Sequence, residues 1–517
     1  MARNITKNKF LFLIFFIFLM SLIKVDYRFE EIEYGKSVDD AEYYYNAVTL
    51  AVDYDLDYSN QMIGVKNRFL NAENDSIVPF HPIGSVILAA PFIFISNLFI
   101  DPFIKSPLVS FNYFIYSLVS IFYLFLSFNL LFLSLTKLKI SFNKIYLSLF
   151  IFGTGVTYYA FDRFSMSHIY EFFSVCFVIY LSTKIITENR TNNSNYFLLG
   201  FLMYVFLAIR FTNYLLIIIP AILLILQNKK LNKIYLNPLF LFGNFVGAII
   251  FLLHTKYLYG IYTFNQASIV LKVENSFGQT YENFFDLTKF TDNISLVFNS
   301  LKIIFFSQEF GLFFFSPIIF VGLIFVIFFA FKKNGSLFLL LGMTYVIPFF
   351  SIIVIQNTAF SYGFRYLYVL IPINIIIYFK YFSENIFVKY YLVYFSVLGL
   401  LGYIFFETTE YTSISQDYLI NSFGMETRYS NPNYLTSLYK SVISFNAYLH
   451  IVFTSFIGVL LIKIINLFVN PVELFSRFTE ITSDIENMLE NSINFSWIKV
   501  LLIYFMIFYF LKRLTKV

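Results

Sequence analysis

The feature that most constrains this chain is a succession of apolar runs, each close to the length of a membrane-spanning helix. One run lies near the N-terminus, at 10–23, and others follow along the whole chain. The later runs cover residues 108–135, 145–160, 169–186, 195–209, 213–227, 235–254, 312–331, 336–355, 366–380, 390–406, 447–468 and 495–512. A bilayer core takes about 20 helical residues to cross, and runs without two-residue alternation indicate helices, not a barrel. The sequence therefore predicts an all-α, polytopic membrane protein with about 12 to 13 transmembrane helices.

Composition agrees with this class and excludes others. Hydrophobic residues make up 59% of the 517 residues and charged residues only 13%, whereas about a quarter of a soluble domain is charged. The formal net charge of +5 is small, and the lysines are scattered between the apolar runs. No basic patch suits nucleic acid, so we expect no nucleic-acid partner. Cys176 is the only cysteine, which excludes an internal disulfide.

Basic residues between the runs predict the orientation. The stretch 83–100 is apolar, but it contains Pro91 and ends at Asp101 and Pro102, so we expect it to lie along the membrane interface. Basic clusters then fall on the side of the N-terminus, at 137–144, 184–190, 229–233, 332–333 and 380–389. The positive-inside rule makes that side cytoplasmic. The basic residues at 512–516 do not fit this alternation, which would place them outside.

Three segments outside the runs complete the predicted organisation. Residues 24–107 form a long first extracytoplasmic loop, which we expect to contain membrane-parallel helices. An outer loop follows at 407–446, and 470–492 reads as an amphipathic surface segment in which acids alternate with spaced apolar residues. We divide the chain into a module at 1–380 and C-terminal transmembrane helices at 381–517.

The first extracytoplasmic loop carries the sharpest chemical signal, a pair of acids at the start of a predicted helix. Asp39 and Asp40 follow Ser37, which can cap a helix together with the acid three residues later. Tyr43 and Ala47 would share one face of that helix. Acids in a first helical turn are also stabilised by the helix dipole without any catalytic role. The position alone leaves both interpretations open.

Other polar residues map to the same outer mouths of the predicted helices. This rim comprises Asp39, Asp40, His81, Asp162, Arg163, His168, Arg210, Asn213, His254, Glu309 and Arg365. Ionisable groups near a membrane core are costly, so their presence at one end of several helices predicts a shared polar cavity. A transporter would place such groups near the midplane, between repeats with broken helices. The rim favours an enzyme whose chemistry takes place outside.

The motifs resemble the GT-C fold family of polyprenyl-phosphate-sugar-dependent glycosyltransferases, which includes protein O-mannosyltransferases and aminoarabinose transferases. The acid motif from Asp39 to Leu50 is similar to the first outer loop of that family. Later motifs recur in the order of bacterial members: His81-Pro82-Ile83-Gly84, Gly153-Thr154-Gly155 through Tyr158-Tyr159 to Ser167-His168, Arg210-Phe211-Thr212-Asn213, Gly311-Leu312 with Ser316-Pro317, and Gly363-Phe364-Arg365-Tyr366. The resemblance covers residues 10–380, and the remaining residues match no motif.

The resemblance implies a membrane enzyme that transfers a sugar from a polyprenyl-phosphate-linked donor to a glycan, lipid or protein acceptor. It implies an extracytoplasmic active site, a cytoplasmic N-terminus, a bacterial inner or plasma membrane, and an inverting direct displacement. The first acid of the loop motif is the general base in this family, which here is Asp39. Asp40 stands where members commonly have Glu, so its catalytic role is less certain than that of Asp39.

Arginine and neighbouring polar residues are the candidates for substrate binding. Arg365 and Arg210 can hold the departing lipid phosphate in bidentate fashion, which an ammonium group cannot do. The remaining predicted substrate-binding residues are His168, His81, Tyr43 and Asn213. The histidines and the acids at 53–57 stand at no recognised ligand spacing, so no metal site is predicted. Some members of the family need a divalent cation and others do not, which leaves the cofactor open.

Two other functional classes remain as alternatives. A polysaccharide polymerase, ligase or flippase of the cell envelope would also be polytopic, but flippases lack the acid-led first loop, and polymerases usually carry their large outer loop later in the chain. A non-catalytic membrane protein would need neither Asp39 nor Arg365. The sugar and the acceptor depend on the shape of a pocket that no motif records.

Overall fold

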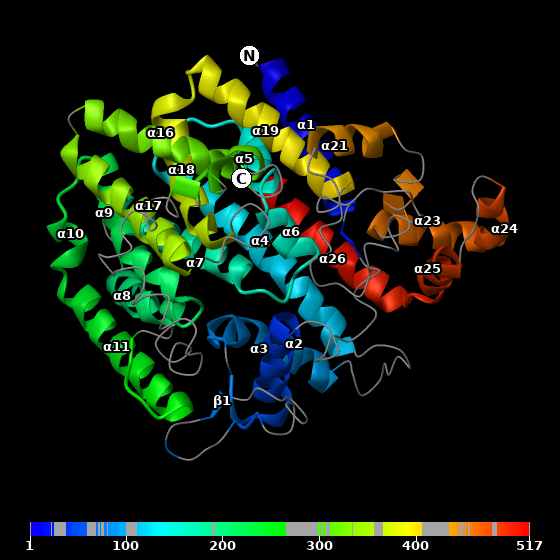
Figure 1. Cartoon of the computed structure of the whole chain (residues 1–517), viewed down its shortest axis with the longest axis horizontal. Helices are drawn as coiled ribbons and strands as arrows, with labels where there is room; N and C mark the ends of the chain where they lie inside the picture. Colours follow the sequence, from blue (N-terminus) through cyan, green and yellow to red (C-terminus); the bar gives the residue numbers. More distant parts are fainter. Residues whose placement is uncertain are drawn as a thin grey trace.

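The computed structural model shows a protein built almost entirely of helices (Figure 1). It describes residues 2–21, 23–24, 38–58, 69–70, 73, 77–79, 81–99, 111–188, 192–264, 298–299, 301–302, 304–306, 311–332, 334–355, 365–405, 434–443, 448–449, 451–452, 455–477 and 483–515. Two short strands, β1 (Phe69–Leu70) and β2 (Ile77–Val78), pair antiparallel in the first loop. Apart from this pairing, the predicted all-α class is confirmed for the described part of the chain.

The helices follow one another along the chain in five groups. The first contains α1 (Ala2–Ser21), α2 (Val38–Val48), the π-helix η2 (Thr49–Asp53) and α3 (Gly84–Phe99). The second contains α4 (Phe111–Lys137), α5 (Lys144–Phe152), α6 (Val156–Phe161), α7 (His168–Thr187) and α8 (Asn193–Leu207). The third contains the 3-10 helix η3 (Phe211–Ile217), α9 (Ile218–Leu226), α10 (Asn232–Tyr235) and α11 (Pro238–Tyr259).

The last two groups lie after residue 311. One contains α15 (Leu312–Phe315), α16 (Pro317–Phe331), α17 (Gly335–Ile355), the 3-10 helix η5 (Arg365–Leu370), α18 (Ile371–Ile377), the π-helix η6 (Tyr378–Phe382) and α19 (Ile386–Phe405). The other contains α21 (Tyr434–Ile443), α23 (Phe456–Asn466), α24 (Pro471–Ser476), α25 (Ser483–Asn494) and α26 (Trp497–Thr515). Of the predicted outer loop 407–446, α21 is the part that the structure describes.

Several helices have the length and apolar character of membrane spans. Within the described residues, α4, α7, α11 and α19 each meet both conditions, and an 80° bend joins α25 to α26 in a further candidate. Shorter apolar helices of 10–17 residues include α3, α8, α16 and α23. The chain thus has the helices of a membrane protein, and the total of about 12 to 13 spans stays a prediction.

Local sequence explains where α11 begins and ends. The side chain of Asn237 accepts hydrogen bonds from the backbone N–H groups of Leu239 and Phe240, which would otherwise lack partners. Pro238 occupies the first helical position, where its missing N–H costs nothing. Gly260 ends the helix with φ of 74°, a left-handed conformation that favours glycine.

Glycines let α8 and α11 pack side by side as a close pair. A Cβ on Gly200 would lie 2.2 Å from the carbonyl oxygen of Phe240, and one on Gly243 would lie 2.2 Å from that of Phe197. Gly247, four residues after Gly243, faces the same neighbour. Small residues at such spacing allow close backbone contact between membrane helices.

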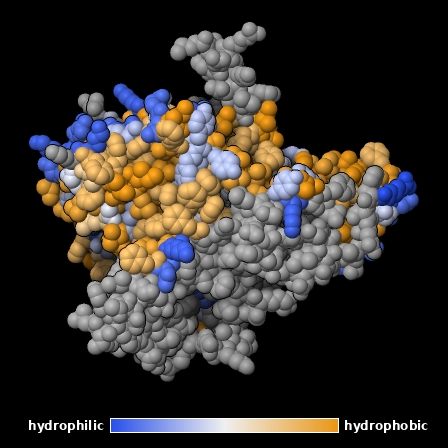
Figure 2. All heavy atoms as spheres, turned by 45° about the horizontal axis from the view of Figure 1, so that its top comes forward, coloured by the Kyte–Doolittle hydropathy of each residue, from blue (hydrophilic) through white to orange (hydrophobic). Residues whose placement is uncertain are grey.

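The other face of α11 is apolar and uncovered. Its exposed side chains include Leu241, Phe242, Phe245, Ile249, Ile250 and Leu253. Figure 2 shows apolar side chains gathered over a broad region of the described surface, with hydrophilic residues along its edge. An uncovered apolar face this large is costly in water, and a lipid environment removes the cost.

Three predicted runs are interrupted in the structure. The run 145–160 breaks between α5 and α6, because the backbone at Gly153 approaches α19 so closely that a Cβ there would lie 2.3 Å from the carbonyl oxygen of Ser396. The run 213–227 begins as the 3-10 helix η3, and 366–380 contains η5, α18 and η6. The last two breaks lie beside residues of the predicted polar rim, Arg210 and Arg365.

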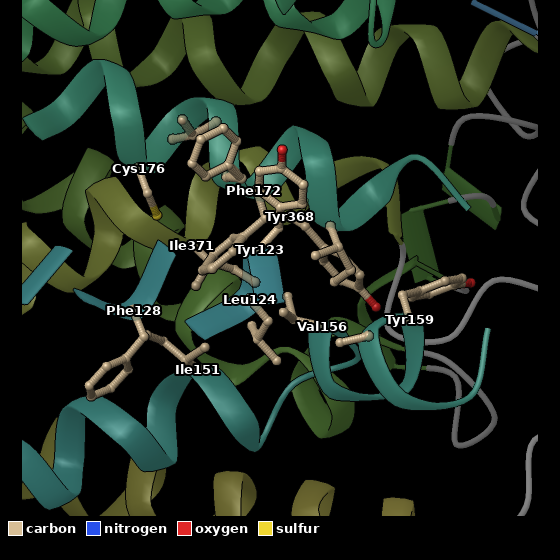
Figure 3. Close-up of a cluster of buried hydrophobic side chains, with 14 of the residues drawn as sticks. Tyr123, Leu124, Phe128, Ile151, Val156, Tyr159, Phe172, Cys176, Tyr368 and Ile371 are labelled. Carbon is tan, nitrogen blue, oxygen red and sulfur yellow. The ribbon is translucent and has the colours of Figure 1, made fainter. Parts of the chain in front are cut away.

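The centre of the core lies between α4 and α7, which pack along most of their lengths. Figure 3 shows Phe128 of α4, Ile151 of α5, Cys176 of α7 and Ile371 of α18 meeting in one buried cluster. Cys176 is fully buried and is not lipid-facing. Helix α18 therefore shares one core with α4, α5 and α7, which lie about 200 residues earlier in the sequence.

The direction of α1 shows at which end of the molecule the helices of the first loop lie. The ring of Phe12 lies 6.3 Å from that of Phe128, and the ring of Phe16 lies 5.0 Å from that of Phe125, so α1 runs antiparallel to α4. In Figure 1 the N-terminus is at the top, whereas α2, α3 and β1 lie at the bottom. The described helices of the first loop thus gather at the end opposite the N-terminus.

The last helix returns to the N-terminal end. Phe495, just before α26, packs on Phe114 at 5.8 Å, and Phe510 packs on Phe125 at 4.9 Å, so α26 runs parallel to α4. The basic residues at 512–513 therefore lie at the end where α1 begins and α4 stops. The alternation of the sequence analysis placed them at the other end, which the direction of α26 along α4 contradicts.

The amphipathic segment 470–492 consists of two helices, α24 and α25, with 478–482 outside the described residues. Ile485, Leu489 and Ser492 of α25 are buried, whereas Glu486 and Glu490 are exposed. The buried side of α25 packs against α23. The apolar face therefore covers a neighbouring helix of the same chain.

Candidate functional site

The predicted acid pair lies in the first turn of α2. Asp39 belongs to this turn, and its side chain lies outside the described part of the chain, as does Ser37, the expected cap. Asp40 is buried, and its Oδ2 accepts a hydrogen bond of 3.1 Å from Nε of Arg163. Arg163 is buried as well and stands in the turn between α6 and α7. The ion pair fastens the helix of the first loop to that turn.

The surroundings of Arg163 keep it charged. Burial lowers the pKa of Arg163, whereas the carboxylate of Asp40 raises it together with Tyr158, and the net direction is upward. The charge of Arg365 acts in the lowering direction, so the two guanidinium groups lie within electrostatic reach of each other. Asp40 thus neutralises part of a cationic region.

A second acid of α2 holds His81. The Oε1 of Glu42 accepts a hydrogen bond of 3.1 Å from the backbone N–H of His81, and its Oε2 lies 2.9 Å from the ring Nδ1. The side chain of Glu42 is buried and that of His81 is partly exposed. Two contacts to one carboxylate fix both the position and the orientation of the imidazole.

Tyr43 connects the same helix to the start of α7. Its hydroxyl donates a hydrogen bond of 3.2 Å to Oγ of Ser167, and its ring lies 4.7 Å from that of His81. Ser167 directly precedes His168, the first residue of α7. Asp40 and Tyr43, which lie in one turn of α2, therefore both contact the segment between α6 and α7.

His168 and Arg210 form the second half of the site. Nη1 of Arg210 lies 2.9 Å from Nδ1 and 3.2 Å from Nε2 of His168. Because a guanidinium can only donate, the imidazole must present a lone pair to it. Glu171, one turn further along α7, is fully buried, and its Oε2 lies 3.6 Å from Nε of Arg210. Arg210 is held between a neutral acceptor and a carboxylate.

An aromatic wall joins Arg210 to Arg365. The guanidinium carbon of Arg210 lies 4.8 Å from the ring centroid of Tyr366, and that of Arg365 lies 5.3 Å from the same centroid. Nη2 of Arg365 donates a hydrogen bond of 3.3 Å to the Tyr366 hydroxyl. Behind this wall, the rings of Tyr159 and Tyr368 lie 5.9 Å apart (Figure 3). The two predicted phosphate-binding arginines therefore share one tyrosine.

Asn213 and the turn at His81 meet on the end of α8. Nδ2 of Asn213 donates a hydrogen bond of 2.7 Å to the carbonyl of Phe206. The backbone N–H of Gly84 donates one of 2.8 Å to the carbonyl of Ala208. A Cβ on Gly84 would lie 2.5 Å from the backbone of Ala208, so only glycine fits there. The first loop is thus docked on the turn that carries Arg210.

A buried ion pair lies beside Arg163. Nζ of Lys24 lies 3.4 Å from Oδ2 of Asp162, and their side chains are only 7% and 4% exposed. The hydroxyl of Tyr403, at the end of α19, donates a hydrogen bond of 3.3 Å to Oδ1 of Asp162. Lys24 also forms a β-bridge with Ser455. N-terminal, central and C-terminal parts of the chain meet at this carboxylate.

Most of the predicted site residues come together in the structure. Asp40, Tyr43, His81, His168, Arg210, Asn213 and Arg365 are linked through the contacts above. Sequence reasoning missed the partners that hold them, namely Glu42, the pairing of Arg163 and the ionic contact between Glu171 and Arg210. Glu42 lies in the acid motif, three residues after Asp39, and this position was the signal that could have found it. Glu309, another member of the predicted rim, lies outside the described residues.

The described residues contain no group of three or more His, Cys, Asp or Glu side chains that could hold a metal ion. In the described part of the rim, Asp40 pairs with Arg163 and Asp162 with Lys24, whereas His81 contacts Glu42 and His168 contacts Arg210. Three guanidinium groups lie in this region: Asp40 contacts that of Arg163, Glu171 contacts that of Arg210, and those of Arg210 and Arg365 flank the Tyr366 ring. Such a cationic set can bind an anion with several oxygens.

No family model, curated protein or solved structure matches this chain. Its function is therefore inferred from the geometry of the site and from the resemblance of its motifs.

Proposed function

We propose that this chain is a polytopic membrane glycosyltransferase that moves a sugar from a polyprenyl-phosphate-linked donor to a glycan, lipid or protein acceptor. The observation that carries the proposal is the ion pair of Arg163 with Asp40 of α2, close to the two arginines that share the Tyr366 ring. An acid-bearing helix packed against a cationic, tyrosine-lined region supplies both of the groups that this transfer needs.

The arginines suit the departing lipid phosphate. The phosphate gains negative charge as the bond to the sugar breaks, and preorganised guanidinium groups stabilise charge at that moment. Arg210 and Arg365 share the Tyr366 ring, which keeps both groups at one place. Arg163 adds a third positive charge, but its contact with Asp40 gives it the additional task of holding α2.

Asp39 is the proposed general base, following the resemblance of the loop motif. An acceptor hydroxyl must lose a proton as it attacks the anomeric carbon, and a carboxylate within hydrogen-bond reach contributes about 10² to 10⁴ in rate. Asp40 is engaged with Arg163, so we assign it to positioning the helix and not to proton transfer. His81, Tyr43, His168 and Asn213 surround this region as substrate-binding residues.

The proposal includes the predicted topology. The site lies at the end of the molecule that holds α2 and α3, and this end is proposed to be extracytoplasmic, with the N-terminus in the cytoplasm. Positive charge in the loops at the opposite end supports this orientation. A bacterial inner or plasma membrane is the proposed location, and the proposed helix total is about 12 to 13.

The test is release of polyprenyl phosphate from radiolabelled polyprenyl-phosphate hexoses. Membranes containing the wild type, Asp39→Asn or Asp55→Asn are mixed with a cell-envelope extract that supplies acceptors. Asp55→Asn is the matched control, because Asp55 is an exposed acid of the same loop. We expect turnover in the wild type and the control, and a loss of about 100-fold or more in Asp39→Asn.

Two outcomes would contradict the proposal. Equal turnover in all three proteins would remove Asp39 as the base. No turnover with any hexose donor, at normal abundance and folding of the protein, would instead favour a polymerase, ligase, flippase or non-catalytic role.

A further inference from the structure

The turn that follows α8 gathers buried polar atoms without hydrogen bonds. Oγ of Ser85, Oδ1 of Asn213 and both ring nitrogens of His254 are inaccessible to solvent and have no hydrogen-bonding partner. Nε of Arg210 is in the same condition, although Glu171 lies 3.6 Å from it. Each unpartnered buried group destabilises the folded state, so a protein seldom retains several together without a use for them.

Two of these side chains are tied directly to the turn. Ser85 follows Gly84, whose backbone N–H bonds the carbonyl of Ala208. Nδ2 of Asn213 donates a hydrogen bond to the carbonyl of Phe206, and Oδ1 of the same side chain has no hydrogen-bonding partner. Both residues are therefore held within one helical turn of Arg210 by backbone-directed contacts.

Because α8 and α11 pack in parallel, His254 of α11 lies near the end of α8. Gly200 faces Phe240 and Asn244, whereas further along Phe251 clusters with Leu207 and Ala208. The next turn of α11 therefore lies beside the residues after 208. His254 belongs to that turn, with its ring 6.0 Å from that of Phe251. Ser85, Asn213 and His254, here called the hydroxyl set, belong to three elements that contact this turn.

The chemistry of the hydroxyl set suits sugar hydroxyls better than phosphate. Asn213 Oδ1 can only accept a hydrogen bond, and the Ser85 hydroxyl can donate and accept. A neutral imidazole has one nitrogen that donates and one that accepts. A phosphate, which accepts only, would leave the acceptors unsatisfied, whereas a sugar hydroxyl satisfies both kinds of group. The neighbouring guanidinium of Arg210 can donate hydrogen bonds to the phosphate of the same ligand.

We propose that the hydroxyl set is the subsite for the hydroxyl groups of an uncharged sugar, whose phosphate lies against Arg210. This inference rests on the proposed function and narrows its donor to a neutral hexose or pentose, because none of the three side chains is a carboxylate that could pair with an amino sugar. The proposal also explains why polar atoms are buried beside the turn that joins α8 to η3.

The experiment measures lipid binding to the purified full-length chain. Wild type, Ser85→Ala and Ser96→Ala are titrated with polyprenyl phosphate and with its glucose, galactose and mannose esters, and melting temperatures are recorded without lipid. Ser96 is the matched control, because it is another buried hydroxyl of α3 with no hydrogen bond, 11 residues beyond Ser85. His254→Leu provides a second, independent removal of polar atoms.

We expect Ser85→Ala to weaken binding of at least one sugar ester by about 2- to 10-fold and to leave binding of polyprenyl phosphate unchanged. Its melting temperature should equal or exceed that of the wild type, because an unsatisfied hydroxyl is removed. His254→Leu should act in the same direction, and Ser96→Ala should alter neither lipid.

Three results would overturn the inference. Equal weakening of both lipid classes by Ser85→Ala would indicate a general distortion of the arginine region. Unchanged binding in both Ser85→Ala and His254→Leu would mean that these atoms hold only water. If the wild type binds neither polyprenyl phosphate nor any sugar ester, the proposed function itself fails, which the first two results would not imply.

Discussion

Nε of Arg163 lies 3.1 Å from Oδ2 of Asp40, and this contact joins the helix of the first loop to the turn before α7. Both side chains are buried. The acid pair of the loop can therefore act on the rest of the site only if Arg163 keeps α2 in place.

Removing one member of this pair should destabilise the protein strongly. In Asp40→Asn, Arg163 keeps its buried charge but loses this carboxylate, and breaking a buried pair costs about 3 to 5 kcal/mol. We expect a large fall in melting temperature in detergent. The double variant Asp40→Asn/Arg163→Gln should be less destabilised than the sum of the two single variants. Additive effects would show that the pair is not coupled.

The contribution of Arg163 should be insensitive to pH around neutrality. A group whose pKa is raised on folding contributes stability that is fully present below its unfolded pKa and is lost as the pH rises through the folded pKa. Arg163 has its pKa raised from an ordinary value that is already far above neutral. The difference in melting temperature between wild type and Arg163→Gln should therefore stay constant from about pH 6 to about pH 9. A difference that shrinks within this range would contradict the assignment.

Gly84 should tolerate no side chain. A Cβ there would lie 2.5 Å from the carbonyl carbon of Ala208 and from the backbone nitrogen of Ile209, and backbone atoms cannot move aside cheaply. Gly84→Ala should lower both the melting temperature and transferase activity. Gly342→Ala is the control, because the nearest atom to its Cβ would be a Val326 methyl at 4.0 Å. That variant should be neutral or stabilised by up to about 1 kcal/mol.

Glu42 should determine the tautomer of His81. The carboxylate lies 2.9 Å from Nδ1 and can only accept when ionised, so the neutral ring should carry its proton on Nδ1. The chain has four histidines, which makes ¹⁵N NMR of histidine-labelled protein tractable. In Glu42→Gln the amide can donate to Nδ1, and the proton should move to Nε2. His81→Asn identifies the signal, and an Nε2–H tautomer in the wild type would refute the prediction.

The positions of the chain ends can be tested by labelling. Cys176 is fully buried, so single cysteines can be introduced without removing it. Lys512→Cys and Lys332→Cys are both at exposed positions and should react with a membrane-impermeant maleimide from the same side. Tyr54→Cys, at a 63% exposed position of the first loop, should react from the opposite side. Labelling of Lys512→Cys together with Tyr54→Cys would place α26 the other way round.

The helical class of this chain follows from hydrophobicity alone, because runs of span length leave no other fold in lipid. The positions at which those runs break could not be predicted from hydrophobicity. Gly153 interrupts a run because α19 crosses its backbone, and a contact with residue 396 cannot be read from local sequence. Likewise the direction of α26 is seen only in its contacts with Phe114 and Phe125 of α4, which charge counting does not record.

The residue types of the site were predictable, whereas their pairings were not. His81, His168 and Arg210 stood out because polar groups are rare at helix mouths in so apolar a chain. The choice of Glu42 as the partner of His81 depends on how the first loop folds back over α3, across 39 residues. Ion pairs form between residues that the tertiary fold brings together, and neither periodicity nor motif spacing contains that information.

The contact between Lys24 and Asp162 also sets an order of events during synthesis. The two residues are separated by 138 positions, which take roughly 7 to 30 seconds to translate. Ser455, which bridges Lys24 through the backbone, emerges later still. Until Asp162 has been translated, the carboxylate that pairs with Lys24 is not yet present. The charged amine of Lys24 therefore stays in water or among lipid headgroups during that time. Tyr403 and Ser455, from the part of the chain in which no motif is recognisable, thus complete the junction at the end of the first helix, which is assembled only when synthesis is nearly finished.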